Sequence, residues 1–370
     1  MTALGRLVCA VWIYLLAFRG RFWLFADPPD AGPVPAASVA AIIPARNEAE
    51  VIARSLQSLA KQQYSGPFRV VVVDDHSEDA TAAIAAPFAG VIRAKALPLG
   101  WTGKLWAVSQ GVAHAGEPEY LLLTDADIVH APGNLAGLVA RARAGNCDLV
   151  SYMAKLRCES FAERALIPAF VFFFFLLYPP AWTADLRRRT AGAAGGCMLI
   201  RREALERIGG IAAIRSELID DCALARAVKQ SGGRVWLGLN RSVESIRAYG
   251  GFAEIAHMIS RTAFTQLNYS AGLLAATIAG LVLVYLAPLA LTLHGSLWGA
   301  AAWLMMSLAY LPALLYYRRN PLWAFLLPLI AAFYMGCTIA SAMQHWRGVG
   351  GAWKGRVASN APSSSPPSLP

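Results

Sequence analysis

Four aspartates suited to binding a metal ion or a phosphate-bearing ligand follow two short apolar runs. Asp74 and Asp75 end the run RVVVVDD, and Asp125 and Asp127 end the run LLLTDAD. Runs of this kind are typical of buried parallel strands, and open α/β sheets bind ligands at the carboxyl ends of such strands. We therefore expect the four carboxylates to share one crevice at the edge of a parallel sheet.

The triplet Asp125-Ala126-Asp127 places two carboxylates in acid-x-acid spacing. Carboxylate oxygens are hard ligands that suit Mg²⁺ or Mn²⁺, and these ions commonly share their coordination with substrate phosphates. A structural alternative is that such acids only begin a turn or cap a helix after the strand. Two clusters in succession favour the metal site, with Mg²⁺ or Mn²⁺ as the expected cofactor.

A third expected strand, Val39 to Pro44, also ends in polar residues. It is followed by Arg46, Asn47 and Glu48, and then by a helix whose apolar residues recur at helical spacing. The free N–H groups at a helix N-terminus bind anions. This turn is therefore a natural place for an anion or a nucleoside.

Taken in order, the motifs resemble those of the family 2 glycosyltransferases, from about Val39 to Arg261. The resemblance is carried by Pro44-x-x-Asn47-Glu48, Asp74-Asp75-x-Ser77-x-Asp79, Gly103-Lys104, Asp125-x-Asp127, Gly195-Gly196 and Asp220-Asp221-x-x-Leu224. It implies an α/β fold of the GT-A type, Rossmann-like with a mostly parallel sheet. It also implies a nucleotide-sugar donor, with a UDP-sugar as the expected one.

The resemblance implies a role for each position. Asp127 would be the leading metal ligand, and Asp125 would contact the metal or the ribose. Glu48 and either Asp74 or Asp75 would hold the nucleoside, because carboxylates accept hydrogen bonds from uracil N–H and ribose hydroxyl groups. The other implied donor-binding residues are Pro44, Arg46, Asn47, Lys104 and Arg261.

Lys104 would contact the diphosphate or the donor sugar, unless it is an ordinary solvated surface lysine. Asp221 matches the family's general base, which removes a proton from the acceptor hydroxyl, and the adjacent Asp220 is a second catalytic candidate. A single base opposite a diphosphate leaving group implies in-line displacement with inversion at the anomeric carbon. The rival interpretation of the two acids is a helix N-cap with a charge that compensates the helix dipole.

The chain departs from the family pattern after this base. Many membrane members carry Gln-x-x-Arg-Trp, whereas this chain has Met258-Ile-Ser-Arg261-Thr262. Arg261 can still bind a pyrophosphate, but the tryptophan that lines the acceptor channel of processive synthases is missing, which favours a single transfer. The segment MISRTAFTQLNYS and a phenylalanine-rich insert resemble the hopene-associated glycosyltransferases of bacterial hopanoid gene sets. This implies a polycyclic lipid acceptor.

The composition indicates a membrane protein. Hydrophobic residues make up 56% of the 370 residues and charged residues 15%, with a mean hydropathy of +0.45, more apolar than a typical soluble domain. Three apolar stretches have about the 20 residues that cross a bilayer, namely Ala271–Leu293, Leu297–Tyr317 and Leu322–His345. The shorter run Leu7–Phe18 lacks a small-residue cleavage site, so we expect an uncleaved anchor.

We expect four parts: a membrane anchor and linker (1–36), a GT-A domain (37–265), a transmembrane region (266–346) and a tail that is basic and then disordered (347–370). Segment 161–189 is expected to lie at the membrane interface, with a buried core helix as the alternative. Its Arg187, Arg188 and Arg189 could meet anionic headgroups. The tail motif Trp353-Lys354-Gly355-Arg356 resembles that of lipid glycosyltransferases related to ceramide glucosyltransferases.

Arg19 and Arg21 follow the anchor and would keep the next domain in the cytoplasm by the positive-inside rule. The expected location is thus the bacterial inner membrane, with several spans. Three further full spans would, however, place the basic tail outside. Pro328 and Gly336 interrupt the last stretch, so a re-entrant hairpin or an interfacial segment could return the tail to the cytoplasm.

The net charge of +10 points to a membrane and phosphates. Nucleic acid is not expected as a partner, because the chain has no helix-turn-helix, zinc or base-stacking pattern, and its six cysteines lack Cys-x-x-Cys spacing. The expected partners are a nucleotide-sugar donor, a lipid acceptor and the membrane. Two alternatives stay open, a polyprenyl-phosphate glycosyltransferase and a catalytically inactive membrane scaffold.

Overall fold

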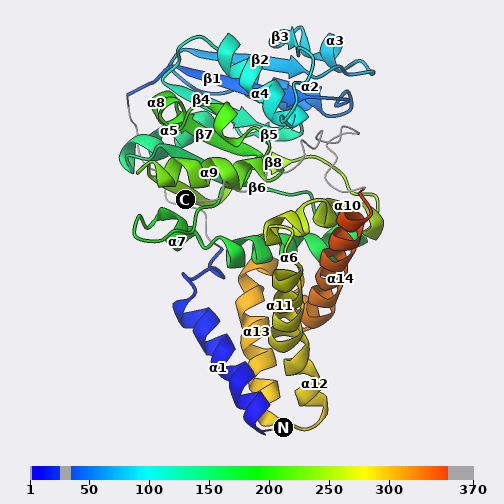
Figure 1. Ribbon diagram of the computed structural model, residues 1–370. Coiled ribbons are helices and arrows are strands. Elements are labelled where there is room, and N and C mark those ends of the chain that lie inside the picture. The colour runs from blue at the N-terminus through cyan, green and yellow to red at the C-terminus, as the bar shows by residue number, and fades with distance from the viewer. Residues whose placement is uncertain (1, 26–34, 349–370) are drawn as a thin grey trace, which may run out of the picture.

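An eight-stranded mixed sheet forms one half of the molecule in the computed structural model, which describes residues 2–25 and 35–348 (Figure 1). The strand order is β3-β2-β1-β4-β7-β6-β8-β5. β7 runs antiparallel to β4 and β6, and β5 antiparallel to β8, whereas the other pairs are parallel. The strands are β1 Val39–Ala45, β2 Phe68–Asp74, β3 Gly90–Arg93, β4 Tyr120–Thr124, β5 Ile128–His130, β6 Leu149–Lys155, β7 Cys197–Arg201 and β8 Val235–Ser245. The predicted mostly parallel α/β fold is confirmed.

Two apolar cores cover the two faces of the sheet. Successive side chains of a strand point to opposite faces, so Ile43 of β1 enters one core and Ile42 the other. Burial on both faces explains why the strands are continuous apolar runs. The helices of this domain are α2 Ile52–Ala60, α3 Thr81–Ala85, α4 Gly103–His114, α5 Asn134–Ala144, α8 Arg202–Arg207 and α9 Asp220–Gln230, with the 3-10 helix η1 Ile211–Ile214.

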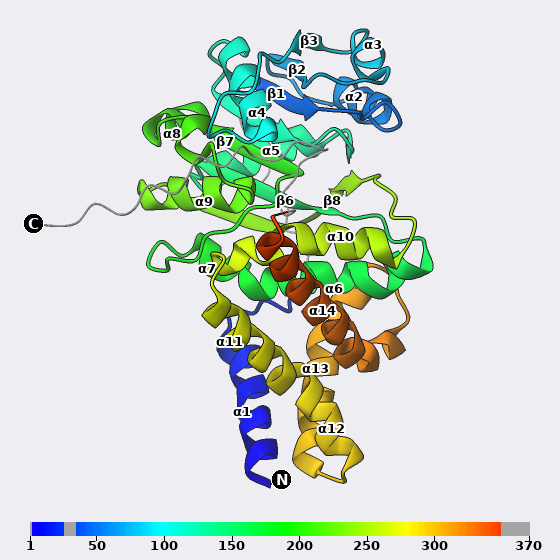
Figure 2. The same cartoon turned by 45° about the vertical axis from the view of Figure 1, so that its right-hand side comes forward.

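An apolar helical bundle extends away from the sheet domain (Figures 1 and 2). It contains α1 Thr2–Phe18, α11 Ala271–Leu281, α12 Ala287–Leu293 and α13 Leu297–Tyr316, with a π-helical turn, Val282–Leu286, between α11 and α12. The start of α1 meets the start of α13 at the end of the bundle far from the sheet, where Trp298 packs against Gly5. The beginning of α1 and the turn between α12 and α13 therefore both lie at this distal end.

The last apolar stretch turns back on itself beside α13 (Figure 2). Tyr317, after the end of α13, accepts a hydrogen bond from Leu156 N of the sheet domain at 3.3 Å. The 3-10 helix η4, Pro321–Leu326, then lies deeper along α13, where Trp303 Nε1 donates to the Phe325 carbonyl at 3.3 Å. Helix α14, Leu327–Trp346, returns to the sheet domain. Its Trp346 packs against Phe264.

Helix α6, Phe161–Leu177, lies across the near end of the bundle, under the sheet domain (Figure 2). Its Phe172 and Phe173 pack against Tyr310 of α13 and Tyr334 of α14. The helix begins at Phe161 because Ser160 and Glu163 form a capping box at its N-terminus. Two further helices complete this layer, α7 Pro180–Ala184 and α10 Phe252–Ala263, followed by the 3-10 helix η2 Thr265–Leu267.

Among the described residues, four helical segments are long and apolar enough to cross a membrane: Phe161–Ala184, Ala271–Leu293, Leu297–Tyr316 and Pro321–Trp346. The first has 24 residues and lies within segment 161–189, for which we expect a position at the membrane interface. Thr2–Phe18 is a shorter apolar helix. The tail motif Trp353–Arg356 and most of the linker before residue 35 lie outside the described residues.

Candidate active site

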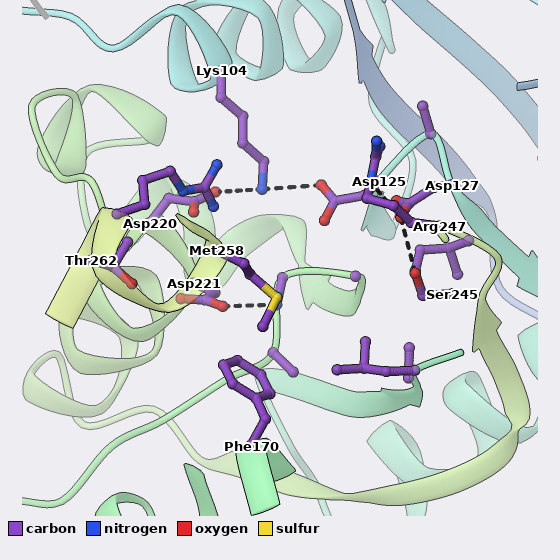
Figure 3. Close-up of a pocket in the computed structure, with 18 of the residues that line it drawn as sticks. Lys104, Asp125, Asp127, Phe170, Asp220, Asp221, Ser245, Arg247, Met258 and Thr262 are labelled. Carbon is purple, nitrogen blue, oxygen red and sulfur yellow. Dashed lines mark hydrogen bonds and ion pairs between the residues drawn. The ribbon is translucent and has the colours of Figure 1, made fainter. Parts of the chain in front are cut away.

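A cavity of about 880 Å³ opens at the sheet edge where β1, β4, β6 and β8 end (Figure 3). The antiparallel strand β7 begins at the same edge, preceded by Gly195 and Gly196, and helices α6 and α10 close the other side. Eight of the predicted site residues line this cavity: Pro44, Glu48, Lys104, Asp125, Asp127, Asp220, Asp221 and, on α10, Arg261. The strand order thus brings segments far apart in the chain to one place.

Lys104 joins the two acidic groups of the cavity. Its Nζ lies 3.0 Å from Asp125 Oδ1 and 3.1 Å from Asp220 Oδ2 (Figure 3). Burial alone would lower the pKa of Lys104, but Asp125, Asp220 and Asp221 outweigh burial, so its pKa is raised. They also offset the unfavourable position of a cation in the first turn of α4. The side chain is only 20% exposed, so the surface-lysine alternative is wrong.

Asp221 faces the cavity from the first turn of α9. Its Oδ2 accepts a hydrogen bond from Gly195 N at 2.9 Å, and its Oδ1 accepts one from Cys222 N at 2.7 Å. Burial and then the neighbouring Asp220 raise the pKa of Asp221 to about 6, although Lys104 and the two amides act in the opposite direction. A fixed carboxylate that titrates near neutral pH is suited to general-base catalysis.

The N-cap interpretation of the acidic pair is wrong. The N-cap of α9 is Ile219, and no side-chain cap hydrogen bond is present there. Asp220 and Asp221 occupy the first turn instead. Their charges suit the helix dipole, but their carboxylates are directed to Lys104 and to the Gly195 amide.

Asp127 is held by Ser245, the last residue of β8, and by Arg247, two residues further on. Ser245 Oγ donates to Asp127 Oδ2 at 2.9 Å, and Arg247 Nε donates to the same oxygen at 3.1 Å. Arg247 also contacts both oxygens of Glu48, at 2.8 and 2.9 Å. Burial alone would lower the pKa of Arg247, but Asp127 and Glu48 outweigh it, so the pKa is raised. One guanidinium therefore bridges two carboxylates that the sequence motifs singled out.

The motifs did not point to Ser245 or Arg247. The signal in the chain is the alternation Val243, Ser245, Arg247, because every second residue of an extended segment lies on the same side. It becomes meaningful only when β8 is known to pair with β5, which places Ser245 opposite Ile128, next to Asp127.

The residues that end β1 and β2 form a separate hydrogen-bonded group. Arg46 donates to the Asp75 carbonyl at 2.7 Å, Asn47 N donates to Ser77 Oγ at 3.0 Å, and Asp74 Oδ1 accepts from Ser77 N at 3.3 Å. Arg46, Asn47, Asp74 and Asp75 are not in the cavity wall. The prediction that all four strand-end acids share one crevice is therefore wrong for Asp74 and Asp75, because β1 separates β2 from β4. Their role in holding a nucleoside stays a prediction.

An apolar patch lies on the side of the cavity away from the strand ends. It is built from Phe170 and Phe174 of α6 and Met258 of α10, and Met153 of β6 lines the cavity as well (Figure 3). Helix α10 also contributes the polar side chains of Glu254, His257, Arg261 and Thr262, of which the first three are exposed. The cavity thus combines charged side chains at the strand ends with an apolar patch on α6 and α10, which fits a ligand with both characters.

A divalent cation fits Asp125 and Asp127 only if a ligand completes its coordination. No cluster of three or more His, Cys, Asp or Glu side chains that could hold a metal occurs in residues 2–25 or 35–348. Each carboxylate has several lone pairs, and the two side chains line the same cavity. Two carboxylates together with phosphate oxygens are a common environment for Mg²⁺ and Mn²⁺, so the residues fit a cation shared with a diphosphate.

Several solved structures are similar to this chain. A mannosyltransferase from Pyrobaculum calidifontis, solved with GDP-mannose and Mn²⁺, is 22% identical, with 93% of this chain and 98% of that chain covered and a TM-score of 0.57. TarS of S. aureus is 19% identical over 61% of this chain and 40% of its own, with a TM-score of 0.42. Glucosyl-3-phosphoglycerate synthase of Mycobacterium tuberculosis is 17% identical over 63% and 79%, with a TM-score of 0.41.

The family match covers only part of the sheet domain, because it ends before α9 and β8. No curated protein sequence matches the chain. Residues 40–209 match the family model described as "Glycosyl transferase family 2", and this range includes β1, β4 and the acid-x-acid motif. These residues are therefore similar to the family 2 glycosyltransferases, and the fold of the chain is of the GT-A type.

Proposed function

We propose that this enzyme is a membrane-bound inverting glycosyltransferase that moves a single sugar from a nucleotide-sugar donor to the hydroxyl group of a lipid. The observation that carries the proposal is the division of the cavity. Its charged side chains include Asp125, Asp127 and Lys104, and its apolar patch contains Phe170 and Phe174. The first suits a sugar diphosphate, and the second suits a hydrocarbon next to the acceptor hydroxyl.

The donor would lie against the strand ends. Asp127 and Asp125 would hold Mg²⁺ or Mn²⁺, and the cation would neutralise the charge that develops on the diphosphate as the glycosidic bond breaks. Lys104 and Arg261 line the same cavity and can bind phosphate oxygens. The similarly folded mannosyltransferase that binds GDP-mannose and Mn²⁺ supports this assignment. We expect Glu48 to contact the nucleoside, beside the group formed by Arg46, Asn47, Asp74 and Asp75.

Asp221 favours a hydroxyl acceptor over a phosphate acceptor. A hydroxyl group must lose a proton to attack the anomeric carbon, and Asp221 supplies a fixed base. A phosphate is already ionised near neutral pH and needs no base. Asp220, Glu217 and Glu254 line the cavity as well, and their charges would repel a phosphate. A polyprenyl-phosphate acceptor is therefore the second candidate.

The proposed location is the bacterial inner membrane, with the sheet domain in the cytoplasm. α1, α11–α12 and α13 would cross the bilayer, whereas η4 and α14 would form a re-entrant hairpin. The hairpin leaves Arg318, Arg319 and Arg347 on the side of the sheet domain, together with Arg19 and Arg21. This distribution agrees with the positive-inside rule, and α6 would lie in the interface.

A reconstitution experiment tests the proposal. The purified chain would be incubated in nanodiscs with Mn²⁺, one radiolabelled UDP- or GDP-sugar at a time, and a lipid extract containing either a hopanoid alcohol or a polyprenyl phosphate. Mass spectrometry of the products identifies the acceptor. Label in a hydroxylated lipid supports the proposal, and label in a hopanoid supports its narrower form, whereas label only in polyprenyl phosphate would favour the second candidate. An inactive scaffold would neither transfer sugar nor bind a nucleoside diphosphate.

A further inference from the structure

Arg247 lies beside Asp127, the predicted metal ligand, where a bound cation would also lie. Its guanidinium lies 3.1 Å from Asp127 Oδ2 and makes a two-oxygen contact with Glu48. We propose that Arg247 and the divalent cation are alternative partners of Asp127, so that the cation binds strongly only when the donor diphosphate draws Arg247 away. This inference rests on the proposed metal and donor.

The charges support exchange rather than simultaneous binding. A guanidinium and a divalent cation on the same carboxylate would lie within a few ångströms of each other in a partly buried site, where like charges repel strongly. Arg247 is 34% exposed, whereas the side chains of Asp127 and Glu48 are 10% and 9% exposed. A diphosphate offers the guanidinium a replacement anion with matching geometry.

The backbone around Arg247 allows its side chain to move while its main chain stays in place. Ile246 N donates to the Asp127 carbonyl at 2.9 Å, which fixes the segment beside the acid-x-acid motif. Tyr249 N donates to Glu163 Oε1 at 2.8 Å, which fixes the other end to the first turn of α6. Only the side-chain torsions of Arg247 remain to carry the guanidinium from carboxylate to phosphate. Ser245 would keep Asp127 oriented during the exchange.

Exchange predicts an order of binding. Without nucleotide, Mn²⁺ competes with a resident cation and binds weakly. With a nucleoside diphosphate, Arg247 turns to the phosphates, both oxygens of Asp127 can serve the metal, and Mn²⁺ binds more tightly. A carboxylate without such a cation would bind Mn²⁺ in either condition.

Mn²⁺ binding to the full chain in detergent, measured by electron paramagnetic resonance of the free ion, tests this directly. Arg247→Gln should tighten Mn²⁺ binding in the absence of nucleotide by roughly tenfold or more, and most of the gain from added UDP or GDP should disappear. Arg247→Lys keeps a cation beside Asp127 and should stay close to the parent protein. Thermal midpoints with and without Mn²⁺ give a second readout, since Mn²⁺ should stabilise the Gln variant more than the parent protein.

Two controls separate exchange from a general change in charge. Arg261→Gln removes one positive charge from the same cavity, and an equal tightening there would overturn the proposal. The double variant Arg247→Gln/Glu48→Gln has the same net charge as the parent protein. It also leaves no Glu48 carboxylate without its Arg247 partner, so folding should not suffer. Exchange predicts that this double variant still binds Mn²⁺ more tightly than the parent protein, and parental or weaker binding would contradict it. If the parent protein binds no Mn²⁺ even with either nucleotide, the proposed metal-dependent function fails instead.

Discussion

The indole Nε1 of Trp12 donates a hydrogen bond of 2.9 Å to the backbone carbonyl of Val284. Val284 lies in the π-helical turn, and its usual helical donor would be residue 288, which is a proline and has no N–H group. Trp12 thus supplies a hydrogen bond to a carbonyl group whose α-helical donor is missing. In a bilayer such a backbone group must find a partner within the protein.

Replacing this donor should loosen α1 from the bundle. Trp12→Phe keeps an aromatic ring against Tyr285 but removes the hydrogen bond, so we expect a loss of about 1 kcal/mol. Thermal unfolding in detergent measures it as a lower midpoint. Tyr14→Phe is the matched control, because Tyr14 is 49% exposed on the same helix. An equal loss in both variants would contradict the assignment.

The rate of sugar transfer should depend on the ionisation of Asp221. Only the ionised form can accept a proton, so with a pKa of about 6 the rate should fall about tenfold per pH unit below that value and level off above it. Asp221→Asn should reduce transfer by roughly 10²- to 10⁴-fold while nucleotide binding survives. The pH profile of kcat/KM checks the first statement. Asp220→Asn is the companion, and an indispensable Asp220 beside a dispensable Asp221 would reverse their roles.

Lys104 should control this titration. It lowers the pKa of Asp221, so Lys104→Gln should move the midpoint of the pH profile upward from about 6 by roughly one unit or more. The variant also leaves Asp125 and Asp220 without their shared cation, so donor affinity should fall. Lys104→Arg keeps the charge and should hold the midpoint near the parental value. An unchanged profile in the Gln variant would refute the coupling.

Asp127→Ala should remove metal-dependent donor binding and leave the sheet domain folded, because the carboxylate lies at a strand end outside the two apolar cores. Loss of a ligand to a phosphate-bound cation should reduce turnover by about a hundredfold or more. Calorimetry with Mn²⁺ and a nucleoside diphosphate measures binding. Ser245→Ala removes a hydrogen bond to the same carboxylate and should have a much smaller effect. Full turnover of Asp127→Ala at saturating Mn²⁺ would eliminate Asp127 as a metal ligand.

Reporter insertions should locate the re-entrant hairpin. A cytoplasmic reporter placed after Arg347 should be active, like one placed within the sheet domain, because α14 returns to that side. The same reporter inserted at Gly295, in the turn between α12 and α13, should be inactive. Inactivity at both positions, with an active reporter in the sheet domain, would show that the last stretch crosses the membrane completely.

The positions of Asp125, Asp127 and Asp221 could be predicted from the sequence because each follows a local pattern, either an apolar strand or the start of a helix. Their assembly with Lys104 follows from the family's motif order. The prediction that Asp74 lies in the same crevice was wrong for a physical reason. The order of strands across a sheet depends on long-range pairing, which no local run of residues specifies.

The role of Arg247 could not be predicted from local sequence patterns, for the same reason. Its partner Asp127 is 120 residues away in the chain, and the two meet only because β8 pairs with β5. The hairpin of η4 and α14 was an open alternative, because Pro328 and Gly336 weaken a span without excluding one. Trp303 and Ser307 donate hydrogen bonds to the carbonyls of η4, which places η4 beside α13 and supports the proposed hairpin.

The capping box of Ser160 and Glu163 joins helix α6 to the loop that carries Arg247. Glu163 is fully buried and accepts hydrogen bonds from Ser160 N and from Tyr249 N, two residues after Arg247. Hydrogen bonds to Glu163 therefore hold the helix that supplies Phe170 and the loop that supplies Arg247 together. A truncated chain without α6 and the apolar helices would lose the part of the cavity wall that α6 forms. It would also lose the hydrogen bond from Tyr249 to Glu163 that holds the loop of Arg247. We therefore expect the smallest active form of the enzyme to include the apolar helices as well as the sheet domain.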